Sequence, residues 1–427
     1  MNPGPASASG LPPVQGFAAP GYEAVRDAFA ENFTALGELG AGVAVVAHGK
    51  PVVSLWAGWA DGARTRPWQR DTLVHVWSTT KAMTALCVHI LMDRGELDPD
   101  APVARYWPEF AAAGKAGIPL RWVLGHRAGL AGLDVPVSVS DLLDWEKMTS
   151  LLAAQKPLWE PGTASGYHAI TFGYLVGEVV RRVTGQSLGQ FFAAEVAGPL
   201  SADFHIGLGR RDLPRCADLA GPSPSERQLA RFAEAFGDGN LAARAQLIGR
   251  PLGVRDVNDP DWRRAEIPAA NGHGTALALA TIAGALATVP EDTVPENTVP
   301  ENTVPENTVP ENTVRANTGP ENTGPPRLIS PATLAAARAG QGRGQDLVLQ
   351  VPMEFGLGVA LSGPEGWFGP NPAAFGHNGA GGSAVSVDPE AGIGFAYVMN
   401  RMGTGLVDDP RKTAVLGAVY ASLDGVR

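Results

Sequence analysis

The chain has 427 residues, of which 44% are hydrophobic and 18% are charged. This apolar fraction is typical of a packed globular protein, so the body of the chain is not expected to be disordered. Gly, His or charged residues interrupt the longest apolar stretches before they reach the roughly 18 residues of a membrane-spanning helix. With two cysteines, the sequence supports neither a disulfide framework nor a zinc site.

The 33 basic and 43 acidic side chains give a net charge of −10. Half of this charge lies in residues 289–327, which contain seven acidic residues and two arginines. The rest of the chain has no basic block, so no nucleic-acid partner is expected. The N-terminal residues lack a basic region followed by an apolar one, so we expect no signal peptide, no membrane partner and a cytoplasmic location.

The first part of the chain is expected to begin with an irregular leader, which is followed by helices and strands. Residues 1–19 are rich in Pro, Gly and Ala and are expected to form a flexible leader. The pattern after them predicts, in chain order, a helix over residues 21–39, a hairpin of strands over 42–49 and 51–60, and a helix over 78–94 that ends before a glycine.

Strand patterns return only near the C-terminus. Residues 96–288 are mostly helical in pattern. The last part predicts strands over residues 355–362, 382–389 and 392–400 and a closing helix over 409–423. Strands at both ends with helices between them predict an α+β fold, in which a sheet domain (residues 20–95 and 327–427) holds an inserted helical domain (residues 96–288).

Residues 289–326 form a low-complexity segment that repeats Val-Pro-Glu-Asn-Thr. A proline every five residues blocks a helix or a central strand, and so polar a repeat buries little. We therefore expect a surface loop, which the sheet tolerates because the entropic cost of closing a loop grows slowly with its length. A lid or a partner-binding segment is the alternative.

The strongest chemical signal is the pair Ser78 and Lys81. Two residues three positions apart share one face of a helix, and a serine at the helix N-terminus lies near the positive end of its dipole. A desolvated lysine with a lowered pKa can accept the serine proton, which makes the serine a nucleophile. The alternative is a capping serine beside a solvated lysine.

Two further segments could complete such a site. Tyr167 lies in a loop ahead of a helix over residues 170–182, and a phenol near a lysine can relay protons. The glycine-rich segment 375–383 precedes a strand, so its backbone N–H groups could bind an oxyanion together with the N–H of Ser78. His377 would supply a donor to the same cleft. A packed tyrosine and a glycine-rich turn with an incidental histidine are the alternatives.

Together these segments resemble the serine β-lactamase and penicillin-binding-protein superfamily, and within it the family VIII carboxylesterases and class C β-lactamase-like hydrolases. The resemblance covers most of residues 20–425 outside the repeat. Residues 95–103, 123–130 and 269–274 are similar to further family segments. The resemblance implies a β-lactamase-like fold with an antiparallel sheet flanked by helices, a small-molecule ester as substrate, and no cofactor or metal.

The resemblance also implies a role for each matching residue. Ser78 matches the family nucleophile, Lys81 its general base, and Tyr167 the tyrosine that relays protons to and from the leaving group. The backbone amides of Ser78 and Ala380 would form the oxyanion hole. Trp159 precedes the tyrosine loop and is a candidate for the wall of an acyl pocket.

Two departures from the family pattern favour an ester substrate. Ala169 stands where the tyrosine motif usually has Asn, and His377 replaces the lysine of a Lys-Thr-Gly triad, whose glycine is Gly379. Loss of an amide and of a fixed cation weakens recognition of anionic β-lactams, whereas a neutral ester needs neither. The sequence therefore predicts a carboxylesterase. A β-lactamase or D-Ala-D-Ala peptidase, an acyltransferase and a non-catalytic binding protein are the alternatives.

Other motifs are expected to be structural. Ser187 lies in a Gly-x-Ser-x-Gly sequence, but the flanking pattern is helical and a nucleophile elbow needs a strand before it. His126 and His273 fall in family-like segments and are expected to be structural, with a contact to the cleft wall as the alternative. The remaining histidines show no ligand spacing, so no metal site is predicted.

Overall fold

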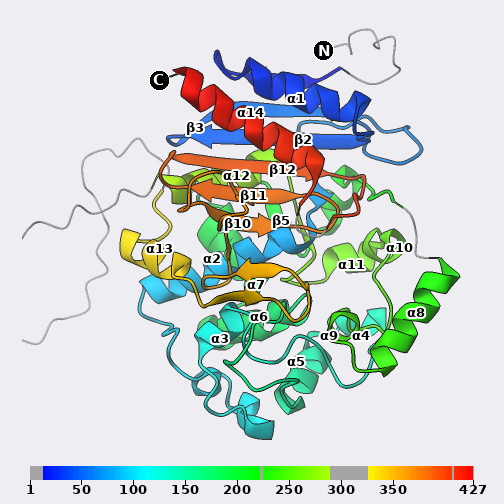
Figure 1. Cartoon of the computed structure of the whole chain (residues 1–427), viewed down its shortest axis with the longest axis vertical. Helices are drawn as coiled ribbons and strands as arrows, with labels where there is room; N and C mark the ends of the chain where they lie inside the picture. Colours follow the sequence, from blue (N-terminus) through cyan, green and yellow to red (C-terminus); the bar gives the residue numbers. More distant parts are fainter. Residues whose placement is uncertain (1–12, 222–224, 289–325, 406–407, 427) are drawn as a thin grey trace, which may run out of the picture.

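The computed structural model describes residues 13–221, 225–288, 326–405 and 408–426. A seven-stranded antiparallel sheet is built from both ends of the chain. It lies in the upper half of the view in Figure 1, above most of the helices. In spatial order its strands are β1 (Gln15–Ala18), β3 (Lys50–Gly58), β2 (Gly40–Ala47), β12 (Ile393–Met399), β11 (Ala384–Asp388), β10 (Phe375–Asn378) and β9 (Ala360–Leu361). The α+β fold predicted from strands at both termini is therefore confirmed.

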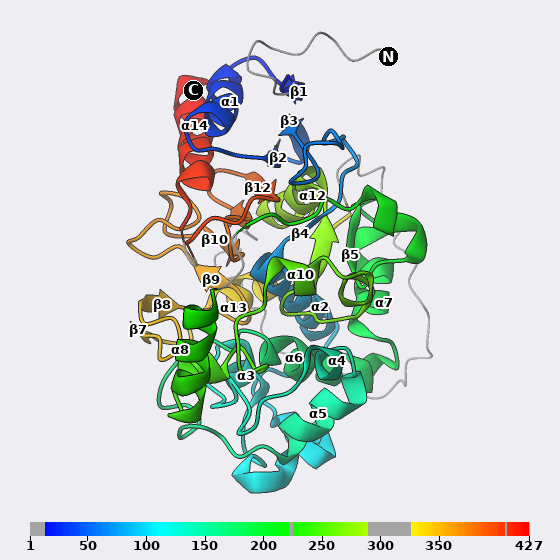
Figure 2. The same cartoon turned by 90° about the vertical axis from the view of Figure 1, so that its right-hand side faces the viewer.

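Helices cover both faces of this sheet (Figure 2). On one face, α1 (Glu23–Thr34) and α14 (Pro410–Val426) pack over alternate strand residues such as Val43 and Tyr397. The strand residues that point to the other face, such as Ala44 and Val398, belong to a second cluster of buried apolar side chains. All residues of β2 and β12 are consequently buried, which explains their nearly unbroken apolar sequences.

The predicted hairpin is present, and its two turn residues have the backbone angles that such a turn requires. His48 and Gly49 join β2 to β3 with φ angles of 49° and 76°. Two central residues at positive φ match the twist of antiparallel strands, and glycine adopts such angles without strain. The hairpin thus carries the two strands that lie beside the C-terminal β12.

The expectation of a flexible leader over residues 1–19 is wrong for its last part. Gln15–Ala18 forms β1 and pairs with β3 at the edge of the sheet. Gly16 permits this approach, because a Cβ atom there would lie 1.9 Å from the Ser54 carbonyl oxygen. Composition missed the strand because strand pairing uses the backbone and needs no apolar pattern. Residues 1–12 and 289–325, which include most of the repeat, lie outside the described residues.

The C-terminal strands differ in part from their predicted lengths. β11 and β12 match the expected strands over 382–389 and 392–400, but only Ala360–Leu361 of the segment 355–362 forms a strand, β9. The start of the glycine-rich segment forms a further strand, β10. Gly376 allows this pairing, because a Cβ there would lie 2.0 Å from the Val385 carbonyl oxygen.

Helix α12 (Ala276–Ala287) packs on the sheet, although residues 96–288 were assigned to the helical domain. It contacts β2, β11 and β12. The approach is close because glycines face each other: a Cβ on Gly394 would lie 2.2 Å from the backbone nitrogen of Gly284. This boundary was misplaced because helical periodicity does not reveal which layer a helix joins.

The other helices form the second part of the molecule, centred on α2 (Thr80–Asp93) and α6 (Thr171–Thr184), which pack together. The others are α3 (Leu120–Leu124), α4 (Val139–Leu142), α5 (Trp145–Ala154), α7 (Leu188–Phe192), α8 (Glu226–Gly237), α9 (Leu241–Arg244), α10 (Val254–Val257), α11 (Pro260–Arg264) and α13 (Pro331–Arg338). Two small sheets join β4 (Val74–His75), β6 (Gly272–Gly274) and β5 (Phe204–Ile206), and β7 (Arg343–Gln345) and β8 (Pro352–Glu354). Within the described ranges, no helix has the length and apolar character needed to cross a membrane.

Candidate active site

Ser78 lies in a single 3₁₀ turn, Trp77–Thr79, that leads directly into α2. The α-helix therefore begins two residues later than predicted. Trp77 has a φ of 47°, an unusual backbone angle for a bulky residue. Its side chain is anchored, since its ring packs edge-on against His75 at 4.7 Å and its indole N–H points to the sulfur of Met402 at 3.2 Å. These contacts maintain the turn that directs Ser78 into a pocket.

Lys81 is fully buried one turn further along α2. Its Nζ lies 3.1 Å from Ser78 Oγ, 2.7 Å from the Ala169 carbonyl oxygen and 2.9 Å from the Ala269 carbonyl oxygen. Burial lowers the pKa of Lys81 well below its ordinary value. A neutral amine can donate its two hydrogens to the two carbonyls, and its lone pair then faces the hydroxyl of Ser78.

A second buried lysine shows how specific this environment is. Lys115 is also fully buried, but its Nζ donates to three backbone carbonyls, those of Ala112, Ala153 and Gln155, at 2.6–2.9 Å. Three acceptors satisfy all three N–H groups of an ammonium ion and leave no lone pair for a reaction. At Lys81 the third partner is a hydroxyl, and a hydroxyl can give up a proton.

Tyr167 joins these two residues from the loop before α6. Its ring centroid lies 4.7 Å from Lys81 Nζ, and its side chain forms a hydrogen bond with Ser78. Burial raises the pKa of Tyr167, the charge of Asp346 adds to this, and the hydrogen bond to Ser78 opposes it. Near neutral pH the side chain is therefore a protonated phenol that can donate to a leaving group.

The turn between β10 and β11 approaches Ser78 from the other side. Gly379 donates its N–H to the Ser383 carbonyl oxygen at 2.7 Å, and a Cβ on Gly379 would lie 2.3 Å from the Val76 carbonyl oxygen. Only glycine allows this approach. Among the described residues, no partner accepts a hydrogen bond from the amide N–H of Ser78 or of Ala380. Both amides are thus available to an oxyanion.

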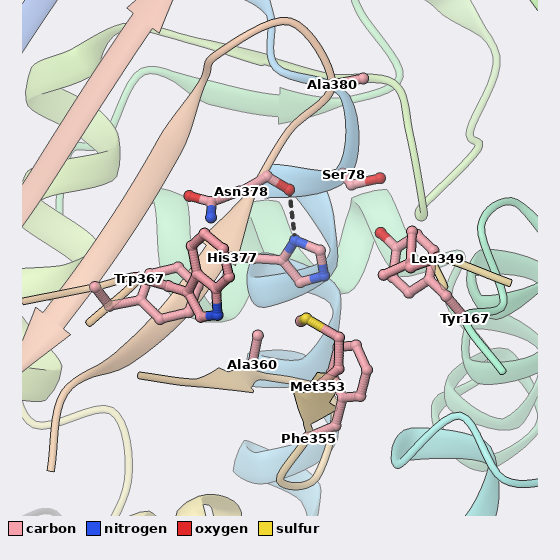
Figure 3. A pocket seen from close by; sticks show the side chains of 11 residues that line it. Ser78, Tyr167, Leu349, Met353, Phe355, Ala360, Trp367, His377, Asn378 and Ala380 are labelled. Atoms are coloured by element: carbon pink, nitrogen blue, oxygen red, sulfur yellow. Dashed lines mark hydrogen bonds between the residues drawn. The ribbon is translucent and has the colours of Figure 1, made fainter. Parts of the chain in front are cut away.

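His377 differs from the expectation of a donor in the cleft. Its Nδ1 lies 2.7 Å from the Asn378 carbonyl oxygen, so Nδ1 must carry the proton and donate (Figure 3). Burial lowers the pKa of His377 to about 3, so the ring is neutral and Nε2 is unprotonated. Nε2 is buried without a partner in the described structure, and His377 lines the pocket. The predicted donor is therefore an acceptor.

The pocket around Ser78 is partly open to solvent, and its space, open mouth included, is about 510 Å³. Figure 3 shows the side chains that line it. Among the described residues, none of those that line it is Lys, Arg, Asp or Glu. The polar lining residues are Ser78, Tyr167, His377 and Asn378, and the others are Leu349, Met353, Phe355, Ala360, Trp367, Phe368 and Ala380. The pocket therefore offers an apolar wall with few polar groups, a character that suits an uncharged ligand.

Sequence reasoning missed one wall of this pocket and misplaced another. Leu349, Met353 and Phe355 come from residues 346–355, whose apolar run was the available signal. Trp159 does not line the pocket; it borders a second hollow with Trp122. Its ring supports the tyrosine loop, because a Cβ on the loop's Gly166 would lie 2.6 Å from it.

The residues expected to be structural agree with that interpretation. Ser187 caps α7 in a turn between helices, and its hydroxyl donates to Glu266 at 2.6 Å. His126 and His273 are fully buried and neither lines the pocket, although the ring of His126 packs 4.9 Å from that of Tyr167. In the part of the chain that the structure describes, no cluster of three or more His, Cys, Asp or Glu residues could hold a metal ion.

Comparison with known proteins places this geometry in a family. A family model described as Beta-lactamase matches residues 26–419. Esterase/beta-lactamase LipL of Mycobacterium tuberculosis (strain ATCC 25618 / H37Rv) is 37% identical over 402 residues, which cover 92% of this chain and 84% of LipL. A family VIII carboxylesterase crystal structure matches with a TM-score of 0.82 and 39% identity, and a penicillin-binding protein homologue from Caulobacter crescentus with 0.80 and 37%. Each match covers 96% of this chain and 100% of the other. The chain therefore belongs to the beta-lactamase family.

Proposed function

We propose that this chain is a serine hydrolase that cleaves carboxylic esters through an acyl-enzyme on Ser78. The observation that carries the proposal is the environment of Lys81. This buried amine has two carbonyl partners, and its third contact is the Ser78 hydroxyl, 3.1 Å away. The family and the esterases among the similar proteins support the same reaction class.

In the acylation step, Lys81 accepts the proton of Ser78 while Oγ attacks the ester carbonyl carbon. The negative charge that develops on the carbonyl oxygen accepts hydrogen bonds from the amides of Ser78 and Ala380. The phenol of Tyr167 donates its proton to the departing alkoxide and recovers one from Lys81. The C–O bond breaks, the alcohol leaves, and the acyl group stays on Ser78.

Deacylation uses the same groups in reverse. A water molecule takes the place of the alcohol. As its oxygen attacks the acyl carbon, it gives one proton to Tyr167, whose own phenolic proton passes to Lys81. The same two amides stabilise the second tetrahedral intermediate. Ser78 then regains a proton from Lys81 and the acid leaves. Burial lowers the pKa of Lys81 and so favours the neutral amine, which can accept a proton in the next turnover.

The pocket favours a neutral ester with an apolar group. None of the described residues that line it is charged, and the family position for a lysine holds a neutral imidazole whose buried Nε2 is unprotonated. A carboxylate on the substrate would therefore lose its water without gaining a cation or a donor from His377. This supports ester hydrolysis over the hydrolysis of anionic β-lactams.

Hydrolysis of p-nitrophenyl butyrate by the wild type and by Ser78→Ala tests the proposal. We expect Ser78→Ala to lower kcat by about 10⁴-fold or more, because the nucleophile is lost. Ser187→Ala is the matched control: it removes a helix cap but should keep the wild-type kcat. A fluorophosphonate should add its mass to the wild type and to Ser187→Ala but not to Ser78→Ala. Wild-type turnover by Ser78→Ala would contradict the proposal.

A further inference from the structure

Asp346 is a fully buried carboxylate in the segment between β7 and β8, and no step above uses it. It forms no ion pair with any described cation. We propose that Asp346 is a positioning residue for Tyr167: it holds the backbone that aims the phenol at Ser78 and Lys81. This inference rests on the proposed function, since it presupposes that Tyr167 transfers protons.

The two oxygens of Asp346 are used differently. Oδ1 accepts three backbone hydrogen bonds, from the N–H groups of Tyr167 at 3.0 Å, Val348 at 2.9 Å and Leu349 at 2.8 Å. Oδ2 accepts one from the hydroxyl of Ser165 at 3.2 Å. A buried carboxylate is costly unless such bonds offset its lost hydration. Two of the four donors lie on the tyrosine loop, 179 and 181 residues away in sequence.

The two segments that Asp346 joins both contribute to the same site. The tyrosine loop carries Tyr167, and the segment after Asp346 carries Leu349 and Phe355, which line the pocket. The ring of Phe355 stacks on that of Tyr167, with centroids 6.0 Å apart and planes 16° apart. If Asp346 only capped the turn at Val348 and Leu349, it would not need to accept a hydrogen bond from the N–H of Tyr167. The extra bond sets the distance of the tyrosine from the Ser78–Lys81 pair.

Three substitutions separate this role from a general structural one. Asp346→Ala removes all four bonds, and we expect kcat to fall about 10- to 100-fold with a smaller change in KM, since small displacements of catalytic groups cost rate. Asp346→Asn keeps Oδ1 and its three backbone bonds, and kcat should stay within about threefold of the wild type. If Asp346→Ala does not fold, Asp346→Glu, which moves the acceptor by one methylene, should lower kcat in the same way.

A double-mutant cycle with Tyr167→Phe is the decisive measurement. If Asp346 acts through the phenol, Asp346→Ala should cost little further kcat once the phenol oxygen is gone, so the two effects should not add. Asp388→Ala is the matched control. Asp388 is also fully buried and caps a turn, but none of its four partners lines the pocket. They are Asn371, Glu390, Ala391 and Tyr420. We expect it to lower stability and leave kcat unchanged.

The possible outcomes separate this inference from the proposed function. An active Ser78→Ala enzyme would overturn the proposed function and the inference with it. With Ser78→Ala inactive, the inference alone fails if folded Asp346→Ala or Asp346→Glu keeps the wild-type kcat. It also fails if the kcat effects of Asp346→Ala and Tyr167→Phe add fully, or if Asp388→Ala lowers kcat as much.

Discussion

His377 decides the charge of the pocket. Its Nδ1 proton is engaged by the Asn378 carbonyl and the ring is neutral, so its other nitrogen, Nε2, carries a lone pair and no proton. A lysine at this position would present a cation and three donors instead. One residue thereby changes which substrates the pocket can accept, although it takes no part in breaking the ester bond.

Replacing His377 with lysine should reverse this preference. We expect His377→Lys to raise kcat/KM for mono-p-nitrophenyl glutarate about tenfold, because a charge-assisted hydrogen bond contributes about 1.5–3 kcal/mol. The matched neutral substrate, p-nitrophenyl valerate, should be hydrolysed at close to the wild-type rate. An unchanged ratio between the two substrates would show that another group sets the charge preference.

The predictability of the site varies with the range of the interaction. Ser78 and Lys81 are three residues apart on one helical segment, so their spacing is visible in the sequence. The proton of His377 depends on the direction of the Asn378 carbonyl, which follows from the path of the strand and not from residue identity. The expected donor was therefore wrong, although the residue itself lies in the pocket.

At the level of elements, the site depends on a close fit between the turn after β10 and the 3₁₀ turn that carries Ser78. The hydroxyl of Ser383 donates to the Val76 carbonyl oxygen at 2.7 Å and links the two. Gly379 lies at the contact, where a Cβ would meet this carbonyl at 2.3 Å. The distance between the amides of Ser78 and Ala380 thus depends on a glycine that does not itself line the pocket.

Gly379→Ala tests this dependence. The added methyl group should push the turn away from Val76 and remove the Ala380 amide from the oxyanion, so we expect kcat to fall about 100-fold or more. Gly40→Ala is the matched control, since its Cβ would lie 2.0 Å from the Trp59 carbonyl oxygen, on a strand remote from the pocket. It should lower the thermal midpoint and keep the kcat of the folded enzyme. Equal kcat for Gly379→Ala and the wild type would refute the dependence.

The elements found from the sequence are those whose own residues are sufficient to define them. β2, β3 and β12 have long apolar runs, and α2 has a helical pattern that ends at a glycine. β1 and β10 were missed because each is short and glycine-bearing and becomes a strand only beside a partner. The segment 346–355 was missed as a pocket wall because its contact with the tyrosine loop spans about 180 residues of sequence.

At the scale of the whole molecule, the burial of histidines makes the free energy of unfolding fall at acidic pH. Six are buried and uncharged in the fold: His75, His89, His126, His168, His273 and His377. Burial lowers the pKa of each: to about 4 for His89 and His168, to about 3 for His273 and His377, and well below the usual value for the other two. In the unfolded chain they bind protons below about pH 6.5.

The sign of the pH dependence follows from this difference. Above about pH 6.5 both states are neutral at these positions, and the stability is fully present. As the pH falls below this value, these histidines bind protons in the unfolded chain but not in the folded one. The free energy of unfolding therefore decreases progressively towards pH 4 to 3. Each histidine contributes about 1.4 kcal/mol of this loss at about pH 5.5.

One buried carboxyl group acts in the opposite direction. Burial raises the pKa of Glu38 to about 7, against the pull of Arg411, so its protonation favours the folded state as the pH falls from about 7. Glu38 binds one proton in the folded state, whereas the six histidines bind as many as six in the unfolded state. We therefore expect the free energy of unfolding, measured by urea denaturation, to fall by at least about 3 kcal/mol between pH 7.5 and 5.5, which corresponds to two histidines at full effect.

A single-histidine variant checks that the histidines cause this loss. His89 lies away from the active site and contacts the Leu357 carbonyl oxygen through Nε2 at 2.7 Å. In His89→Gln the amide can donate to that carbonyl without titrating, so the loss of stability between the two pH values should shrink by about 1.4 kcal/mol. Equal stability of the wild type at both pH values would contradict the prediction, because six uncharged buried imidazoles require a pH-dependent difference from the unfolded chain.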